Sequence, residues 1–239
     1  MTVDGLARGR GGRAPFPHET MHYSLASGIS FCRVAGRFIF LDVPRDRYFC
    51  LSAESERCFA QLVDGESLSQ REHAVLAQLV AGRILKDAAE EAVPLACQFT
   101  SPVRQSLLDT EQRPPALPHV LAAAFSLASA PARLRLLGFD RLLQETARRK
   151  GRGRDLGTEQ LSAVAFAFDR LRLVATAHDR CLVRSIAAAR RLIALGGRPD
   201  LVIGVKLQPF KAHCWVQHGP WLVNDRTEVV RDFTPILVV

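Results

Sequence analysis

The amino-acid sequence predicts an α+β fold, with a small N-terminal module followed by a C-terminal domain in which helices pack on an antiparallel sheet. Short β-prone runs lie in residues 29–51, whereas the middle of the chain carries apolar residues at helical spacing. From Asp200 onward apolar and polar residues alternate, as they do in strands. Because these strands follow the helices and do not alternate with them, the pattern favours α+β over a doubly wound fold.

The composition indicates a globular protein. The 239 residues are 48% hydrophobic with a mean hydropathy of +0.04, which suffices for one large core or two modest ones. Residues 1–20 contain basic residues and glycines but lack the apolar stretch of a secretion signal, so we expect a flexible tail there. The six cysteines are scattered without a CxxC pair, which favours reduced thiols and a cytoplasmic location.

Two kinds of partner are disfavoured by the sequence. The most apolar stretch is interrupted by Pro118, Pro131 and Arg133, which leaves less than the roughly 20 residues of a membrane span. The net charge of +8 keeps a winged-helix DNA-binding protein among the alternatives. The helix expected after Ser69 has few basic residues that could contact phosphates, however. We therefore expect neither a membrane nor a nucleic-acid partner.

The N-terminal module is expected at residues 21–100. Three β-prone runs are separated by the turn sequences "AG" and "VPRD", and Ser52 and Ser69 are placed to cap two following helices. In the second helix Leu76 and Leu79 recur at helical spacing. Three strands followed by short helices predict a winged-helix-like module.

Residues 101–157 are interpreted as a helical linker region, because a polar, proline-bearing stretch leads into two helical segments at about 116–130 and 131–149. A further helix is expected from Thr158. The next one runs from Cys181 and ends at the glycine pair "GG", a common helix stop.

The C-terminal domain is expected at residues 158–239. "DLVIGVKLQ" alternates as a strand, and "KAHCWVQ", "WLVND" and "EVVRDF" are predicted to follow as further strands.

Cys181 is the candidate nucleophile. It opens a helix, where the positive end of the helix dipole favours the thiolate and free backbone N–H groups offer an oxyanion site. A cysteine nucleophile also needs a histidine beside it and a third group that orients the histidine. His213 and Asp225, on the strands that follow, are the candidates for these roles.

Strand alternation makes this hypothesis depend on one turn. A three-residue loop, His218-Gly219-Pro220, would pair Gln217 with Trp221 and place His213 opposite Asp225. A two-residue turn, Gly219-Pro220, would place the two side chains on opposite faces. The hypothesis therefore predicts the three-residue loop.

A zinc site is the alternative use of the same residue types, and geometry argues against it. His213 and Cys214 are adjacent in a strand and project to opposite faces, so they cannot readily share one tetrahedral ion. We expect no metal, and we expect Cys214 and Asn224 to point away from the site. Four cysteines are interpreted as structural: Cys32, Cys50, Cys58 and Cys97.

The runs "CLVRSIAAARRLIALGG", "LVIGVKLQPFKAHCWVQ" and "WLVND" resemble the transglutaminase-like cysteine peptidase domain of the lasso peptide B proteins of the microcin J25 processing type. Cys181, His213 and Asp225 fall on the Cys, His and Asp of that family. Cys214 departs from the family pattern, in which a small residue is usual at this position. The resemblance implies a transglutaminase- or papain-like fold with a Cys-His-Asp triad.

The N-terminal module is similar to the PqqD-like element with which these proteins recognise the leader of their precursor peptide. Such an element would bind the leader as an added strand beside residues 47–51, with apolar pockets from the helix that follows Ser69. The candidate leader-binding residues are Arg47, Tyr48, Phe49, Cys50, Leu51, Leu76 and Leu79.

The resemblance implies a cysteine protease that removes the leader from a ribosomally made lasso precursor with Thr at the penultimate leader position. The implied partners are the precursor leader and an ATP-dependent macrolactam synthetase, the lasso C protein. The family is also connected with ATP, but this chain shows no P-loop, so no cofactor is expected in it. Two alternatives remain open: an acyltransferase or amidase of the transglutaminase fold, and a non-catalytic leader-binding scaffold.

Overall fold

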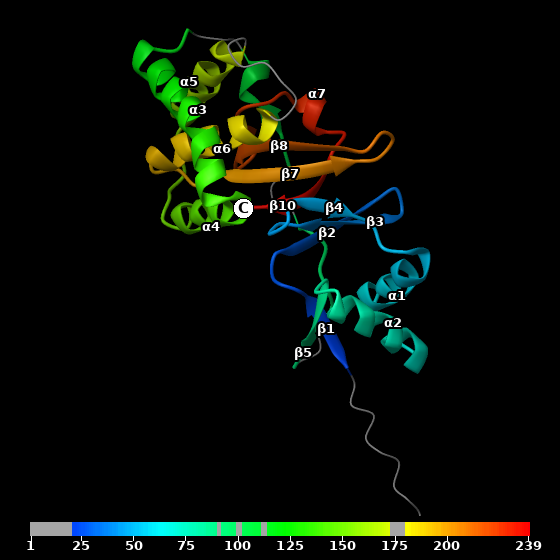
Figure 1. Ribbon diagram of the computed structural model, residues 1–239. Coiled ribbons are helices and arrows are strands. Elements are labelled where there is room, and N and C mark those ends of the chain that lie inside the picture. Colours follow the sequence, from blue (N-terminus) through cyan, green and yellow to red (C-terminus); the bar gives the residue numbers. More distant parts are fainter. Residues whose placement is uncertain (1–20, 90–91, 99–101, 111–113, 173–179) are drawn as a thin grey trace, which may run out of the picture.

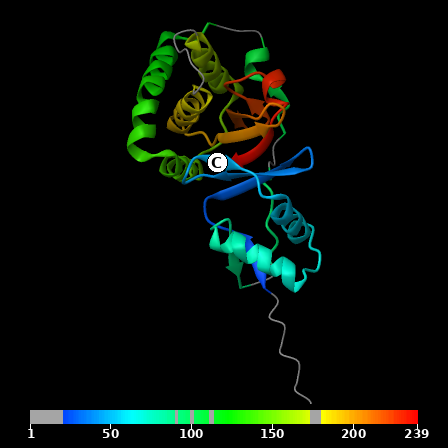
Figure 2. The same cartoon turned by 45° about the vertical axis from the view of Figure 1, so that its right-hand side comes forward.

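The computed structural model describes residues 21–89, 92–98, 102–110, 114–172 and 180–239 (Figure 1). It is a mixed α+β fold with several helices and three small sheets. The N-terminal strands and their two helices lie on one side of the molecule, and the C-terminal helices surround a five-stranded sheet on the other. Figure 2 shows these two parts stacked along the long direction of the molecule.

The N-terminal part begins with a two-stranded sheet of β1 (His22–Leu25) and β5 (Leu85–Ala88). A three-stranded antiparallel sheet of order β2-β3-β4 lies next to it. Its strands are β2 (Ile29–Val34), β3 (Arg37–Asp42) and β4 (Arg47–Phe49).

Helices α1 (Ala53–Val63) and α2 (Gln70–Ala81) follow this sheet, as predicted. Both expected caps are confirmed, since the hydroxyl of Ser52 accepts a bond from Ser55 N and that of Ser69 from Glu72 N. The Glu72 carboxylate accepts a bond from Ser69 N, which completes a capping box.

Strand β3 alternates between two hydrophobic cores. Phe38 and Phe40 face α1, where they meet Phe31 and Phe59 with ring centroids 5.0–5.8 Å apart. The intervening Ile39 and Leu41 are buried on the opposite face, in the core of the C-terminal part. Because side chains of a strand alternate faces, this one sheet is apolar on both sides and joins the two parts.

The C-terminal part has a sheet of order β10-β7-β8-β9-β6. Its long strands are β7 (Asp200–Lys206) and β8 (Lys211–His218), with β10 (Thr234–Val238) at one edge. The short strands are β9 (Trp221–Leu222) and β6 (Gln105–Ser106), and η1 (Leu107–Asp109) continues from β6. All pairs are antiparallel except β6 with β9, which is parallel and departs from the expected all-antiparallel sheet.

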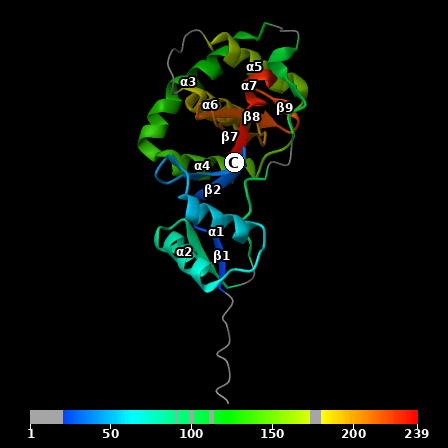
Figure 3. The same ribbon diagram turned by 90° about the vertical axis from the view of Figure 1, so that its right-hand side faces the viewer.

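Four long helices cover this sheet: α3 (Leu117–Leu137), α4 (Phe139–Lys150), α5 (Thr158–Arg170) and α6 (Arg180–Ala194). Figure 3 shows them around the strands β7 and β8. Helix α6 is central, with Ile186, Ala187 and Leu192 almost fully buried. It ends where Gly196 takes a positive φ of 83°, which confirms the predicted glycine stop.

Two predicted elements are wrong. The break between the third and fourth helices was expected at Pro131, but α3 runs through Pro131 and ends at Gly138, whose φ of 77° suits glycine. The run "EVVRDF" was predicted as a strand, but it begins with the short helix α7 (Thr227–Val230). A distant side chain favours this turn, since the Asp109 carboxylate accepts a bond from Thr227 N at 3.4 Å.

Helix α3 is longer than the interruptions in its sequence suggest. With 21 residues and a hydropathy of 1.4 over its most apolar window, it is the one helix of the described residues that is long and apolar enough to cross a membrane by length and composition. About a tenth of that window is buried (11%). One side of α3 packs on α5 and α6, where Ala123 and Ala130 are enclosed. One such helix is weak evidence for a membrane span, because the mostly buried core helix of a soluble protein and a signal sequence meet the same criterion.

Candidate active site

Cys181 lies in the first turn of α6, half-buried at the edge of the C-terminal core. Its sulfur is close to the backbone N–H groups of Leu182, in the same turn, and of Cys214, on β8. Donors of this kind stabilise negative charge at the start of a helix. The helix start predicted from the sequence is therefore present at the candidate nucleophile.

His213 lies on β8, opposite Gly204 of β7. Its ring contacts the rings of Phe233 and Trp215, with centroid distances of 5.2 and 6.1 Å. Gly204 makes room for this arrangement, because a Cβ atom there would lie 2.7 Å from the Trp215 ring. The close approach of an aromatic ring to the backbone thus explains a glycine in the middle of a buried strand.

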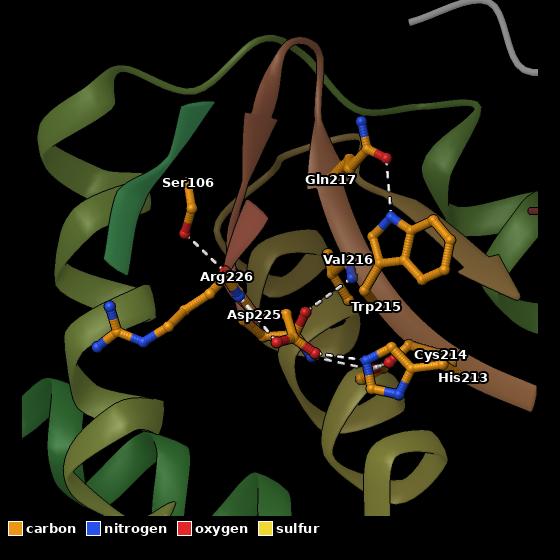
Figure 4. Close-up of polar contacts among 10 residues, drawn as sticks. Ser106, His213, Cys214, Trp215, Val216, Gln217, Asp225 and Arg226 are labelled. Carbon is orange, nitrogen blue, oxygen red and sulfur yellow. Dashed lines mark hydrogen bonds and ion pairs between the residues drawn. The ribbon is translucent and has the colours of Figure 1, made fainter. Parts of the chain in front are cut away.

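Asp225 contacts the same histidine. Its Oδ2 lies 2.5 Å from His213 Nε2, and both side chains are about one-fifth exposed, at 20% and 18%. Figure 4 shows the carboxylate pointing at the ring. Since Nε2 is taken by Asp225, Nδ1 is the ring nitrogen left to face the Cys181 thiol, which is close enough to raise the pKa of His213.

The turn that was expected to permit this contact is wrong. His218 pairs with Trp221 and Gln217 with Leu222, so Gly219-Pro220 is a two-residue turn. Asp225 still reaches His213 because the strand pairing ends at Val223. At the next position the Asn224 side chain, not its backbone, accepts the bond from Val216 N at 2.8 Å. The chain bends there, and strict alternation no longer applies to Asp225.

A second segment fixes Asp225 from the other side. The Ser106 hydroxyl donates to the Asp225 carbonyl oxygen at 2.6 Å, and Arg226 N donates to Asp225 Oδ1 at 2.8 Å (Figure 4). The Arg226 guanidinium is paired with Asp109 at 3.1 Å. Ser106 and Asp109 were not anticipated from the sequence, because they lie more than a hundred positions before Asp225 in a stretch interpreted as linker.

The family comparison covers these three side chains together. Residues 124–238 match the model of the transglutaminase-like superfamily. The C-terminal part is a transglutaminase-like domain. Searches of curated proteins and of solved structures found no match. Members of this superfamily are typically Cys-His-Asp hydrolases, so the match indicates chemistry of the cysteine-protease or amidase type.

The match begins inside α3, earlier than the predicted start of the domain at residue 158. This agrees with the packing, since Ala123 and Ala130 of α3 and Leu142 and Leu143 of α4 belong to the core that also contains α6 and the sheet. The two helices of the region interpreted as a linker thus pack as part of the transglutaminase-like domain.

The electrostatics of the site favour an ion pair. Burial lowers the pKa of His213, but the hydrogen bonds with Asp225 and Cys181 outweigh it and raise this pKa to about 9. Burial raises the pKa of Cys181, but the bond with His213 and the backbone N–H of Cys214 outweigh it and lower this pKa. A thiolate beside an imidazolium is the form in which cysteine is nucleophilic.

Arg184 is a further charged group at the site. It lies one helical turn after Cys181, and its guanidinium donates to the Phe168 carbonyl oxygen at 3.1 Å. Burial lowers its pKa, and the neighbouring carboxylates of Asp169 and Asp225 counteract that effect. Its positive charge therefore lies within electrostatic reach of the carboxylate that orients His213.

Cys214 has a different environment from Cys181. Its side chain is 3% exposed, and burial raises the pKa of its thiol. Among the described residues no group of three or more His, Cys, Asp or Glu side chains has a geometry that could hold a metal ion.

The candidate leader-binding residues do not share one surface. Leu51, Leu76 and Leu79 are buried in the N-terminal core, where their side chains are enclosed. Phe49 stacks on Phe40 at 5.2 Å. Arg47 and Cys50 are exposed. The part of this set that a peptide can reach is therefore the main chain of β4, whose outer edge pairs with no strand among the described residues.

Tyr48 faces the opposite way from Phe49, toward the transglutaminase-like domain. Its ring contacts that of Phe210, in the turn between β7 and β8, at 5.5 Å. Burial raises the pKa of the Tyr48 hydroxyl, and Asp46, Cys214 and Cys181 add to the effect. The hydroxyl of Tyr48, on β4, is therefore close enough to Cys181 for their charges to interact.

Proposed function

We propose that the protein is a cysteine peptidase of the lasso peptide B type, which removes the leader from a ribosomally synthesised precursor peptide. The observation that carries this proposal is the bond between His213 and Asp225 inside a transglutaminase-like domain, with Cys181 near enough that its thiol and His213 shift each other's pKa. The sequence flanks "CLVRS" and "AHCWV" resemble those of the lasso B proteins and support the narrower reading.

In the proposed reaction the Cys181 thiolate attacks the carbonyl carbon at the junction of leader and core. Electrons move to the carbonyl oxygen, which the backbone N–H groups of Leu182 and Cys214 are suited to stabilise. The intermediate collapses with cleavage of the C–N bond, and the leaving amine of the core takes the proton of the His213 imidazolium.

The leader then remains as a thioester on Cys181. Neutral His213 takes a proton from water, which attacks the thioester carbonyl. The C–S bond breaks, so the thiolate is restored beside the imidazolium, and the new carboxylic acid of the leader gives its proton to solvent and leaves as a carboxylate. Asp225 holds the tautomer of His213 by accepting from Nε2.

The N-terminal part is proposed to be a PqqD-like leader-recognition element. Its support is the order of three strands and two helices together with the open edge of β4. A leader bound there as an added strand would make main-chain hydrogen bonds. The contact between Tyr48 and Phe210 brings this strand next to the domain that carries Cys181.

The wider setting is proposed from the same resemblance. The precursor would carry Thr at the penultimate leader position, and cleavage would take place in the cytoplasm. The freed core amine would go to an ATP-dependent macrolactam synthetase. The proposed cleavage requires no cofactor. Whether ATP affects it is tested by comparing the cleavage rate with and without ATP and the synthetase.

The test is incubation of the full-length protein with the precursor peptide encoded beside its gene, read by mass spectrometry. Release of an intact leader and core supports the proposal, and Cys181→Ala should abolish that release. An unchanged precursor that binds tightly would support a leader-binding scaffold instead. A precursor whose mass changes without loss of the leader would support an acyltransferase or amidase.

A further inference from the structure

A buried chain of hydrogen bonds runs behind the candidate active site. Val216 N donates to Asn224 Oδ1, Asn224 Nδ2 donates to the Ser185 hydroxyl, and that hydroxyl donates to the Cys214 carbonyl oxygen. Each of the three bonds is 2.8 Å long. Ser185 is fully buried at 0% exposure and Asn224 is 7% exposed.

This chain connects the three elements that carry Cys181, His213 and Asp225, and at each element it is attached beside the candidate residue. Ser185 lies one helical turn after Cys181 on the same face of α6. Cys214 directly follows His213 on β8, and Asn224 directly precedes Asp225 in the bend after β9.

The direction of the three bonds is fixed. Val216 N can only donate, so Asn224 must present its oxygen there and its amide nitrogen to Ser185. Ser185 then has one proton, which goes to the Cys214 carbonyl. An aspartate at 224 could not donate to Ser185 and would bury a charge, so the arrangement requires an amide.

We propose that Ser185 and Asn224 are positioning residues, which hold the bend after β9 in register with α6 and β8 and thereby keep the Asp225 carboxylate against His213. The inference rests on the proposed role of Cys181, His213 and Asp225. A merely structural role for the same bonds would change the stability of the fold but not the ionisation of Cys181.

The experiment therefore measures ionisation without any substrate. Full-length protein is treated with iodoacetamide across a pH series, and the rate of Cys181 alkylation is followed by peptide mapping. The exposed Cys50 serves as an internal reference. Asp225→Asn calibrates the result, because loss of the carboxylate should move the alkylation midpoint of Cys181 upward by roughly one pH unit.

Asn224→Ala and Ser185→Ala should each shift the midpoint in the same direction, with a rate at neutral pH that is several-fold lower than in the unmodified protein. The double variant should shift no further than the larger single shift, because both residues act through one chain. Ser185→Ala removes only a hydroxyl, so it supplies the test if Asn224→Ala does not fold.

Thr146→Val is the matched control. Thr146 is also a buried hydroxyl, 4% exposed, but its bond to the Leu142 carbonyl lies within α4. We expect it to change the melting temperature without moving the alkylation midpoint. If Ser185→Ala and Asn224→Ala behave like Thr146→Val, the positioning role is wrong. If the protein does not cleave the precursor but these midpoint shifts are observed, the proposed substrate is wrong and the positioning role still holds.

Discussion

His213 lies between a thiol and a carboxylate, so the charge of the whole group depends on its protonation. The sequence proposed these three side chains as candidates through the helix start at Cys181 and through family-like flanks. It did not reveal why they meet, because the bend at Asn224 depends on a side-chain bond to Val216 that no local pattern announces. Ser106 was missed for a similar reason, since its partner lies far away in the sequence.

Replacement of the thiol should separate binding from chemistry. Cys181→Ala should abolish leader removal and leave leader binding unchanged, because the variant keeps the edge of β4. The measurement is precursor mass after incubation, together with titration of labelled leader. Cys97→Ala removes a half-buried thiol outside both proposed sites and should cleave normally. A Cys181→Ala protein that still cleaves would show that another group is the nucleophile.

Cys214→Ala provides the second thiol test. The Cys214 side chain is buried and its pKa is raised, so it should not act as a nucleophile. We expect nearly normal cleavage and a loss of about 1 kcal/mol in unfolding free energy from the small cavity. Urea denaturation and the precursor assay measure the two effects. If a folded Cys214→Ala protein does not cleave the precursor, Cys214 and not Cys181 is the nucleophile.

The raised pKa of His213 gives the stability of the protein a pH dependence. A histidine whose pKa is 6.5 unfolded and about 9 folded contributes stability that is complete below pH 6.5 and is lost as the pH rises through about 9. Asp225→Asn removes a main cause of this rise. The difference in unfolding free energy between the two proteins should therefore be larger at pH 6 than at pH 10. Equal differences in urea denaturation at both pH values would contradict this assignment.

At the scale of elements, signals close together in the sequence predicted well and signals that depend on packing did not. Ser52, Ser69 and Gly196 marked helix ends through their own local chemistry. Pro131 was misleading, because packing of α3 on α5 and α6 outweighs one missing backbone bond. The run after Asp225 alternates like a strand, but the contact of Asp109 with Thr227 holds its start as a helical turn.

Helix α3 offers a direct check of that explanation. Pro131 is exposed inside the helix and cannot donate to the Leu127 carbonyl. Pro131→Ala should restore this bond and raise the free energy of unfolding by about 1–3 kcal/mol. Ala132→Gly, one position later in the same helix, should lower it by about 1 kcal/mol. No gain from Pro131→Ala would mean that the helix is adapted to the proline.

Strand β7 makes a sharper demand at Gly204. A Cβ atom there would lie 2.7 Å from the Trp215 ring and 3.0 Å from the Phe233 Cβ, and the rings of both residues contact His213. Gly204→Ala should therefore lower the melting temperature and reduce the alkylation rate of Cys181 by displacing His213. Gly157→Ala tests a glycine with open space around its Cβ position and without a positive φ, and it should leave that rate unchanged. Normal alkylation in Gly204→Ala would show that the ring can move without effect.

At the scale of the whole molecule, the sheet β2-β3-β4 belongs to both cores. The sequence predicted two modules joined by a helical region, because each has its own periodicity. The sequence could not show that the two cores share this sheet. A strand with apolar residues on both faces is equally typical of a strand buried within one domain. Ile39, Leu41 and Val43 are buried against the transglutaminase-like domain at 1%, 0% and 5% exposure.

Leader binding should be visible along β4 in the full-length protein. If the leader adds as a strand, the free main-chain N–H groups of residues 47–51 should gain protection from hydrogen exchange. Phe49→Pro removes a donor and should weaken leader binding, whereas Phe49→Leu keeps the donor and should bind nearly normally. Exchange mass spectrometry and titration of labelled leader measure these effects. Protection confined to the C-terminal strands would refute leader binding at β4.

The contact of Tyr48 with Phe210 has a kinetic consequence for the proposed peptidase. A leader bound to β4 is held on a strand that packs on the transglutaminase-like domain. The scissile bond is therefore connected to the enzyme by a short length of peptide and stays near Cys181. Its effective concentration at Cys181 is then set by the length of peptide between the docked segment and the cut, on the order of millimolar for a short flexible tether. Under that condition the dissociation constant of the leader governs the KM. Residues around the cut need little affinity of their own, so the same enzyme can release cores of very different sequence.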